Sequence, residues 1–217
     1  MSCAIKPNLV WLMRLVVITE PGESGRGHEE VARAALAGGC RAVQMRDKEL
    51  SDREFARVAA GLKELCRRSS ALFFVNDRVD VAAAVGSDGV HLGVEDVDVE
   101  SARRLMPTGA IIGFSPEGLD EARAAVAAGA DYLGVGPVFA TPTKGDAGVP
   151  MGLEGLAPYV KAHVAPVIGV GGINAENAAS VLEAGASGVA VVSAVTRAGD
   201  VQAATRALVS MLEGAAS

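Results

Sequence analysis

Hydrophobic positions follow one repeating pattern from residue 14 onward: a short β-branched run, a turn, and an Ala-rich amphipathic stretch that ends at Gly. The apolar runs predict eight strands, at Leu15–Thr19, Ala42–Arg46, Leu72–Asn76, Gly89–Leu92, Ile111–Phe114, Tyr132–Gly136, Val167–Val170 and Gly188–Val192. The amphipathic stretches predict helices at Glu29–Ala37, Asp52–Arg68, Leu119–Ala128, Glu176–Ala184 and Val201–Leu212. Two stretches have a weaker helical pattern and are expected to be short or irregular, Val79–Val85 and Val99–Leu105.

Three of the predicted helices end in similar phrases, AGGCRAVQ, AAGADYLGVG and EAGASGVAVV, with Gly where a left-handed backbone favours it. Strands that alternate with helices form a parallel sheet with right-handed crossovers, and eight of them close a barrel. A doubly wound open sheet is the alternative, but no GxGxxG sequence opens the first strand–helix unit. The sequence therefore predicts a single (β/α)8 TIM barrel over residues 1–217, with residues 1–13 as an N-terminal lead-in.

Composition narrows the classes of function. The formal net charge of −6 and the lack of a basic cluster argue against a nucleic-acid partner. The apolar segment 9–18 contains Arg14, is too short to span a bilayer and lacks a cleavage signal, so we expect no membrane partner. Cys3, Cys40 and Cys66 lack zinc or disulfide spacing, and are expected to be reduced thiols in a cytoplasmic protein. The Ala-rich outer helices would permit a homo-oligomer.

The stretch GVGPVFATPTKGDAG, residues 134–148, is the most informative for function. An apolar strand gives way at Pro137 to a loop with two hydroxyls, Thr141 and Thr143, followed by Lys144 and glycines. Backbone N–H groups, hydroxyl donors and a point charge together are suited to binding a phosphate. Taken alone, these residues fit a solvent-facing surface loop equally well.

In TIM barrels the active site lies at the carboxyl ends of the strands. The second predicted strand ends in Gln44, Arg46 and Lys48, and their alternate spacing places them on one face. If that face is the barrel mouth, an amide and two cations converge there. The competing interpretation is a strand end with ordinary solvated charges.

Two carboxylates follow the third and fourth predicted strands. Asn76 and Asp77 end one of them, and Asp96 comes soon after the other. Neighbouring parallel strands lie about 5 Å apart, so Asp77 and Asp96 can approach one another. Adjacent carboxylates near a phosphate are explained by a shared Mg²⁺ that keeps some of its waters. The competing interpretation for Asp77 is an N-cap of the following helix.

Other residues at the predicted mouth have weaker signals. Ser115 is either a mouth hydroxyl or a helix N-cap, and His91, inside an apolar strand, is interpreted as a hydrogen-bonded core histidine. Gly171 and Gly172 follow the seventh strand, and Val192 and Ser193 stand at the end of the eighth, where barrels of this kind hold phosphates. Three acidic residues are expected at helix starts or on the surface: Asp80, Glu95 and Asp98.

The motifs QMRDK, the ND of VNDRVDVA, GVHLG-x-x-D, GADYLGVGPVF-x-TPTK, GVGGI and AVVSA occur in the order seen in thiamine-phosphate synthase, and the chain resembles that family over nearly its whole length. The resemblance implies a transferase of thiamine biosynthesis. It would join 4-amino-2-methyl-5-pyrimidinylmethyl diphosphate to 4-methyl-5-(2-phosphoethyl)thiazole, releasing thiamine phosphate and diphosphate.

The resemblance also implies roles for individual residues. The pyrimidine diphosphate would be bound by Gln44, Arg46, Lys48, Asn76, Ser115 and Lys144. Of these, the catalytic groups would be Arg46, Lys48, Ser115 and Lys144. The thiazole phosphate would be held by Thr141, Thr143, Gly171, Gly172, Val192 and Ser193. One Mg²⁺ per subunit would be held by Asp77 and Asp96.

The chain departs from the family pattern after Ser115, where Pro116 and Glu117 replace the Ser-Thr or His that is frequent there, and at Val94, where a polar residue is frequent. A thiazole tautomerase is the nearest alternative, but those relatives have a His after the serine and lack the intact TPTK loop. An epimerase or isomerase barrel would need a general acid/base pair instead. A non-catalytic phosphate sensor would not need Asp77 and Asp96.

Overall fold

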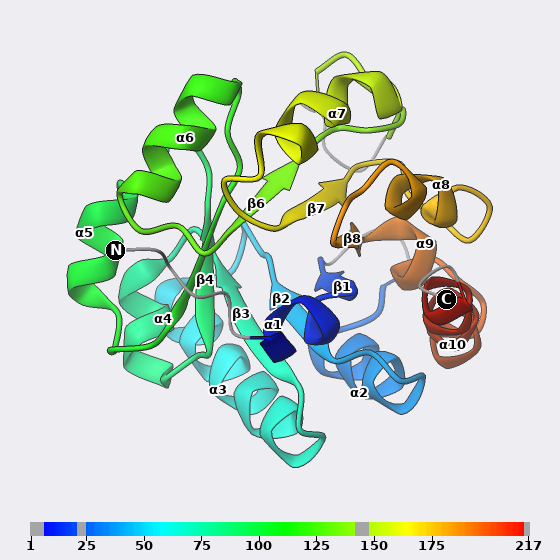
Figure 1. Ribbon diagram of the computed structural model, residues 1–217. Helices are drawn as coiled ribbons and strands as arrows, with labels where there is room; N and C mark the ends of the chain where they lie inside the picture. Colours follow the sequence, from blue (N-terminus) through cyan, green and yellow to red (C-terminus); the bar gives the residue numbers. More distant parts are fainter. Residues whose placement is uncertain (1–6, 21–24, 142–147, 215–217) are drawn as a thin grey trace.

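The computed structural model describes residues 7–20, 25–141 and 148–214. Parallel strands in these ranges close a barrel in chain order (Figure 1). They are β1 (Leu15–Thr19), β2 (Ala42–Met45), β3 (Leu72–Asn76), β4 (Gly89–Leu92), β5 (Ile111–Phe114), β6 (Tyr132–Val135), β7 (Val167–Val170) and β8 (Gly188–Val191). The predicted (β/α)8 TIM barrel is confirmed, and β2, β6 and β8 end one residue before their predicted ends.

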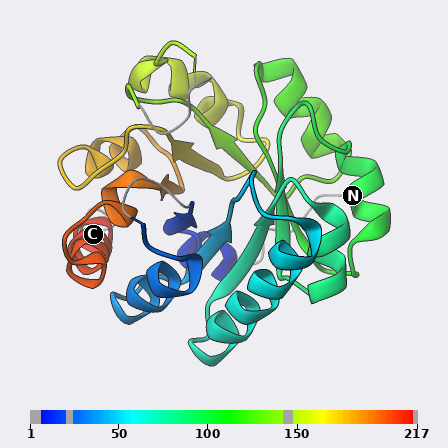
Figure 2. The ribbon, with the colours of Figure 1, turned by 180° about the vertical axis from the view of Figure 1, so that it is seen from behind.

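Helices surround the barrel in both views (Figures 1 and 2). They are α1 (Pro7–Leu12), α2 (His28–Ala37), α3 (Asp52–Arg68), α4 (Val79–Val85), α5 (Val99–Leu105), α6 (Leu119–Ala127), α7 (Gly152–Ala162), α8 (Ala178–Glu183), α9 (Ser193–Thr196) and α10 (Val201–Gly214). The two weakly patterned stretches form α4 and α5 with the bounds given by the sequence. The pattern missed α1, α7 and α9, because α7 carries two glycines and an internal Pro158 and the other two are short.

The predicted left-handed glycines after three helices are confirmed. Gly39, Gly129 and Gly185 follow α2, α6 and α8 with φ of 102°, 113° and 96°. Only glycine adopts this region without a steric penalty, so each helix ends abruptly and the chain turns back toward the barrel.

Alternation along the strands divides the buried residues into two cores. Residues that point into the barrel, such as Val16, Ile18 and Phe74, form the smaller one. Helix α1 closes one end of the barrel (Figure 1) and adds Leu9 to this core, and Met13, just after the helix, belongs to it as well. The larger core lies between strands and helices. Because both strand faces are buried, the strands are continuous apolar runs, as is typical of parallel sheets.

Two aspartates tie neighbouring strands together at the amino-terminal end of the barrel. Asp88, before β4, accepts hydrogen bonds from the Phe73 backbone N–H at 2.8 Å and from Lys63 Nζ at 2.7 Å. Asp131, before β6, accepts from the Ile112 N–H at 2.8 Å and also pairs with Arg103. Each carboxylate therefore satisfies a strand amide and a cation at once.

Burial dominates the chemistry of the two cysteines in the described ranges. Cys40 and Cys66 are free and buried, and burial raises the pKa of their thiols to about 11 and about 12. Cys3 lies outside the described residues. No helix in the described part of the chain is both long and apolar enough to cross a membrane.

Candidate active site

A cavity of about 390 Å³ lies at the carboxyl ends of the strands, and residues on or just after all eight strands line it. Every predicted site residue within the described ranges lines this cavity: Gln44, Arg46, Lys48, Asn76, Asp77, Asp96, Ser115, Thr141, Gly171, Gly172, Val192 and Ser193. The predicted Thr143 and Lys144 lie outside the described residues. The rule that barrel chemistry sits at the carboxyl ends of strands therefore located the cavity from sequence.

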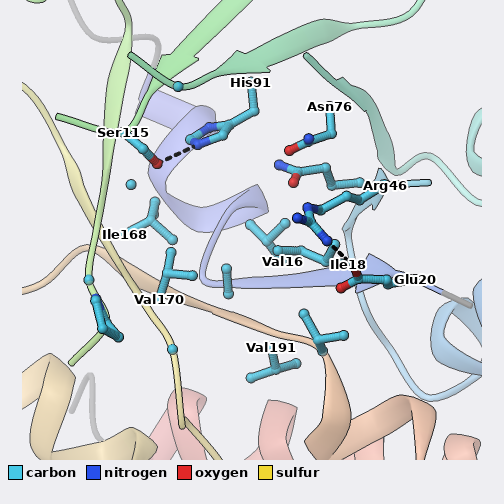
Figure 3. A pocket seen from close by; sticks show the side chains of 18 of the residues that line it. Val16, Ile18, Glu20, Arg46, Asn76, His91, Ser115, Ile168, Val170 and Val191 are labelled. Atoms are coloured by element: carbon cyan, nitrogen blue, oxygen red, sulfur yellow. Dashed lines mark hydrogen bonds and ion pairs between the residues drawn. The ribbon is translucent and has the colours of Figure 1, made fainter. Parts of the chain in front are cut away.

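The cavity has an apolar side and a polar side (Figure 3). Ile168, Val170 and Val191 lie on one side, across from Arg46 and Asn76 on the other. Apolar side chains can cover the faces of a planar heterocycle, while an amide and a cation can hold charged oxygen atoms. The cavity is thus suited to a ligand with an apolar ring and a charged end.

Arg46 is held in place by Glu20, a residue that the sequence interpretation missed. Glu20 follows β1, lines the cavity and forms an ion pair with the Arg46 guanidinium (Figure 3). The Arg46 backbone N–H also donates to the Thr19 carbonyl at 3.0 Å. The same strand-end rule would have found Glu20, because it is the first polar residue after Thr19.

Asp47, between the two mouth cations, fixes the turn after β2. Its Oδ1 accepts from the Glu49 and Leu50 backbone N–H groups at 2.8 Å, and its Oδ2 lies 3.0 Å from His28 Nε2. His28 Nδ1 in turn lies 2.9 Å from Thr19 Oγ1, which ties the turn to β1. Burial alone would raise the pKa of Asp47, but these hydrogen bonds hold it below its ordinary value.

Asp77 lies in a tight turn after β3 and has a φ of +64°. Its backbone N–H donates to the His91 carbonyl at 2.8 Å. The N-cap of α4 is Arg78, with no side-chain cap bond, so the N-cap interpretation of Asp77 is wrong. A left-handed conformation is uncommon outside glycine, although Asp tolerates it better than most residues, and such conformations cluster at functional sites.

Asp77 and Asp96 face one another, as predicted. Burial and then the charge and hydrogen bond of Asp96 raise the pKa of Asp77 to about 6, although Arg46 and Lys48 act to lower it. Asp96 Oδ2 also accepts the Gly93 N–H at 2.7 Å. Two facing carboxylates, of which Asp96 raises the pKa of Asp77, are suited to sharing a cation.

The donor set fits Mg²⁺ better than a metal with an all-protein cage. Among the described residues no group of three or more His, Cys, Asp or Glu could hold a metal ion. Mg²⁺ commonly takes one or two carboxylates and completes its shell with water and phosphate oxygens. Asp77 and Asp96 together supply that minimum.

The glycine pair after β7 packs against the start of the loop after β6. Gly171 and Gly172 have φ of 93° and 65°, and a Cβ on Gly172 would lie 2.5 Å from the Ala140 carbonyl oxygen. The Phe139 N–H donates to the Gly171 carbonyl at 3.1 Å. Asn177 Nδ2 donates to the Gly172 carbonyl at 3.0 Å and holds the turn from the other side. The two predicted phosphate-binding segments are therefore neighbours.

Ser115 belongs to the cavity and does not cap a helix, because the N-cap of α6 is Gly118. Its Oγ lies 2.8 Å from His91 Nε2 (Figure 3). His91 is hydrogen-bonded, as predicted, but it lines the cavity. Its other ring nitrogen lies 2.9 Å from the Tyr132 hydroxyl, a group that the sequence interpretation missed because Tyr132 begins its strand.

The remaining acidic residues behave largely as expected. Asp98 is the N-cap of α5, with its side chain accepting from the Ser101 N–H at 2.8 Å. Asp80 lies in the first turn of α4. Glu95 is exposed at the rim of the cavity. Pro116, where the chain departs from the family pattern, also lines the cavity, so the departure falls on the site itself.

The fold and the cavity at the carboxyl ends of the strands define a (β/α)8 barrel enzyme. Its cavity is lined by cations, two facing carboxylates and a glycine-rich turn. The family model TMP-TENI, described as thiamine monophosphate synthase, matches residues 15–195. The chain is 50% identical over 198 residues to a thiamine-phosphate synthase of Moorella thermoacetica, covering 91% of this chain and 94% of that one. It is 52% identical to one from Chloroflexus aurantiacus, covering 90% of each. The chain belongs to the thiamine monophosphate synthase family.

A solved structure agrees with this assignment. A thiamine phosphate pyrophosphorylase from Pyrococcus furiosus superposes with a TM-score of 0.89 at 45% identity, covering 97% of this chain and all of that one. The family predicted from the motifs is confirmed.

Proposed function

We propose that the cavity at the barrel mouth carries out the thiamine-phosphate synthase reaction. One observation carries this proposal: every predicted substrate-binding residue that the structure describes lines the same cavity, in a chain of this family. Its apolar side would cover the pyrimidine and thiazole rings. Its polar side would hold the diphosphate of one substrate and the phosphate of the other.

In the proposed reaction the bond between the pyrimidine methylene carbon and the diphosphate oxygen breaks, and its electron pair leaves with the diphosphate. The thiazole nitrogen then donates its lone pair to that carbon and forms the new C–N bond. The electron-rich aminopyrimidine stabilises the methylene cation between the two steps, so no protein nucleophile is needed. The protein contributes by positioning the two rings and by stabilising the leaving charge.

Arg46 and Lys48 are placed to meet that charge. Both line the cavity, and both act electrostatically on Asp77. Mg²⁺ bound by Asp77 and Asp96 would add positive charge at the diphosphate oxygens as they leave. Gln44 is 4% exposed and lines the cavity, and its amide would contact the pyrimidine substrate.

The thiazole phosphate would lie on the other side of the mouth. There the Gly171–Gly172 turn meets the start of the loop after β6, with Thr141 and Ser193 lining the cavity nearby. The short helix α9 begins at Ser193, in the place where barrels of this kind hold a phosphate. The cytoplasm is the compartment that fits such a biosynthetic role, and Cys40 and Cys66 are free thiols.

Product formation tests this proposal directly. Purified protein is mixed with both substrates and excess Mg²⁺, and thiamine phosphate and diphosphate are each quantified. Equal molar yields of the two products are expected, and omission of either substrate abolishes both. Folded protein that binds the thiazole phosphate but forms no thiamine phosphate would overturn the proposal. Isomerisation of an unprocessed thiazole by the same protein would favour the tautomerase alternative.

A further inference from the structure

Tyr132, His91 and Ser115 form a chain of hydrogen bonds along the wall of the cavity, which all three residues line, with the buried Tyr132 at its inner end. The Tyr132 hydroxyl lies 2.9 Å from His91 Nδ1, and His91 Nε2 lies 2.8 Å from Ser115 Oγ. The three residues belong to three adjoining segments, β6, β4 and the end of β5. Figure 3 shows the His91 ring directed at Ser115 on the cavity wall.

The Tyr132 phenol is the fixed end of this chain. Its side chain belongs to the interior core, and in the described part of the chain its hydroxyl has His91 as its only hydrogen-bond partner. Burial raises the pKa of Tyr132, so the phenol keeps its proton under all ordinary conditions. A buried hydroxyl hydrogen without an acceptor is costly, so the phenol must donate to His91 Nδ1.

This requirement determines the positions of the other protons. If Nδ1 accepts from the phenol, a neutral imidazole carries its proton on Nε2. Nε2–H then donates to Ser115 Oγ, which leaves the serine hydrogen directed away from His91 toward the cavity. If His91 carried its proton on Nδ1, or on both ring nitrogens, Nδ1 would be a donor. The phenol hydrogen of Tyr132 would then lose its acceptor.

Packing holds the chain in this arrangement. The Phe74 ring meets the Tyr132 ring edge to face, with centroids 6.0 Å apart. A Cβ on Gly113 would overlap the Tyr132 ring and its hydroxyl, and one on Gly134 would lie 2.8 Å from His91 Cε1 and 3.0 Å from Ser115 Oγ. Two strands thus carry glycine where a side chain would displace a member of the chain.

The direction of the final hydrogen bond matters for an anionic ligand. Diphosphate oxygens only accept hydrogen bonds, so a serine that faces them must donate. A serine whose hydrogen is engaged by His91 would present lone pairs to the anion instead. Fixing the order of donors before the ligand arrives is a form of preorganisation.

We propose that Tyr132 and His91 are positioning residues that fix Ser115 as a hydrogen-bond donor toward the bound pyrimidine diphosphate. The identity of that ligand rests on the proposed function, whereas the order of donors and acceptors does not. Neither Tyr132 nor His91 needs to touch a substrate for this role.

Nitrogen-15 NMR of the histidine side chains tests the order of donors without any substrate. The chain has three histidines, and the His91 signals are identified by their loss in His91→Gln. We expect the Nε2-protonated tautomer in the wild-type protein at neutral pH and a mixture of tautomers in Tyr132→Phe. An Nδ1-protonated or doubly protonated His91 in the wild type would overturn the proposal, whatever the protein's activity.

Kinetics then test the consequence for the ligand. Tyr132→Phe is expected to raise KM for the pyrimidine diphosphate about threefold to tenfold, in the range of a weakened charge-assisted hydrogen bond. The kcat and the KM for the thiazole phosphate should stay within about twofold. Tyr159→Phe, the matched change at the other tyrosine, lies in α7 and outside the cavity lining, and should alter neither.

A double-mutant cycle separates positioning of Ser115 from a general structural role. In a Ser115→Ala background, Tyr132→Phe is expected to have no further effect on KM for the pyrimidine diphosphate, because the group it acts through is gone. Effects that multiply in the double mutant would show that Tyr132 acts by another route and would overturn the proposal.

Discussion

The two ends of the barrel use aspartate in opposite ways. At the amino-terminal end, Asp88 and Asp131 each receive a strand N–H and a Lys or Arg. At the mouth, Asp77 faces Asp96, and its pKa rises to about 6 because of burial and that second carboxylate. The protein therefore neutralises Asp88 and Asp131 by itself, whereas Arg46 and Lys48 offset only part of the burial and repulsion at Asp77.

This difference separates stability from function on one scaffold. A carboxylate whose partners are all in the chain holds strands together, so its loss should lower the free energy of unfolding. Carboxylates that repel one another cost stability in the absence of a ligand, and their retention is explained by what they bind. The distinction does not follow from position alone, because Asp47 lies at the mouth and has a full set of partners.

The largest expected effect is on catalysis. Asp77→Asn should reduce kcat/KM by about 100-fold or more, because one of the two proposed Mg²⁺ ligands would be lost and the leaving charge would be less stabilised. Its melting temperature should be equal to or above that of the wild type, because the repulsion with Asp96 is removed. Asp80→Asn, on the exposed face of α4, removes the same charge nearby and should leave kcat/KM unchanged. A clear loss of stability in Asp77→Asn would place Asp77 with the structural aspartates.

The reverse result is expected at the other end of the barrel. Asp131→Ala should lower the free energy of unfolding by about 1–3 kcal/mol, because the buried Ile112 N–H loses its acceptor. Activity per folded molecule should not change. The measurement is chemical denaturation, with Asp120→Ala as control, since its pair with Arg123 is exposed and should contribute little. Loss of activity in correctly folded Asp131→Ala would contradict the separation of roles.

A smaller effect, with a characteristic pH dependence, is expected for Asp47. Burial would raise the pKa of Asp47, yet its hydrogen bonds with His28 and the loop amides hold the pKa below the ordinary 3.8. The ionised form therefore stabilises the fold at pH values well above 3.8, and this contribution is lost as the pH falls through the lowered pKa. Asp47→Asn should destabilise the protein by about 1 kcal/mol at pH 7.

Chemical denaturation of the wild-type protein and of Asp47→Asn, from pH 7 down to pH 3, checks this prediction. The difference in unfolding free energy should shrink on acidification. A difference that is constant or grows toward low pH would show that the charge of Asp47 is not what stabilises the turn.

The barrel was predictable from the sequence because short local patterns of apolar and turn residues determine its strands and helices. All strand starts agree with the structure, since each apolar run is bounded by turn residues. Helix α7 was missed because its glycines and Pro158 mask the helical pattern. Its packing against α6 and β7 holds it in place.

The site was predictable where its residues follow the rule that active sites of these barrels lie at the carboxyl ends of the strands. Polar residues just after strands were found because the carboxyl ends of parallel strands meet. Tyr132 was not found, because it starts its strand, although it too lines the cavity and contacts His91. The pairing of Asp77 with Asp96 was predictable from strand order, whereas the ion pair of Glu20 with Arg46 depends on side-chain positions that no spacing encodes.

The role of the facing carboxylates is tested most directly by a calorimetric titration of Mg²⁺, in the presence of inorganic diphosphate, into wild-type protein, Asp77→Asn and Asp131→Ala. We expect one saturable Mg²⁺ site per chain in the wild type and in Asp131→Ala, and none in Asp77→Asn. Equal Mg²⁺ binding by the wild type and Asp77→Asn would contradict the claim that the carboxylates left unneutralised at the mouth are the ones that hold the metal.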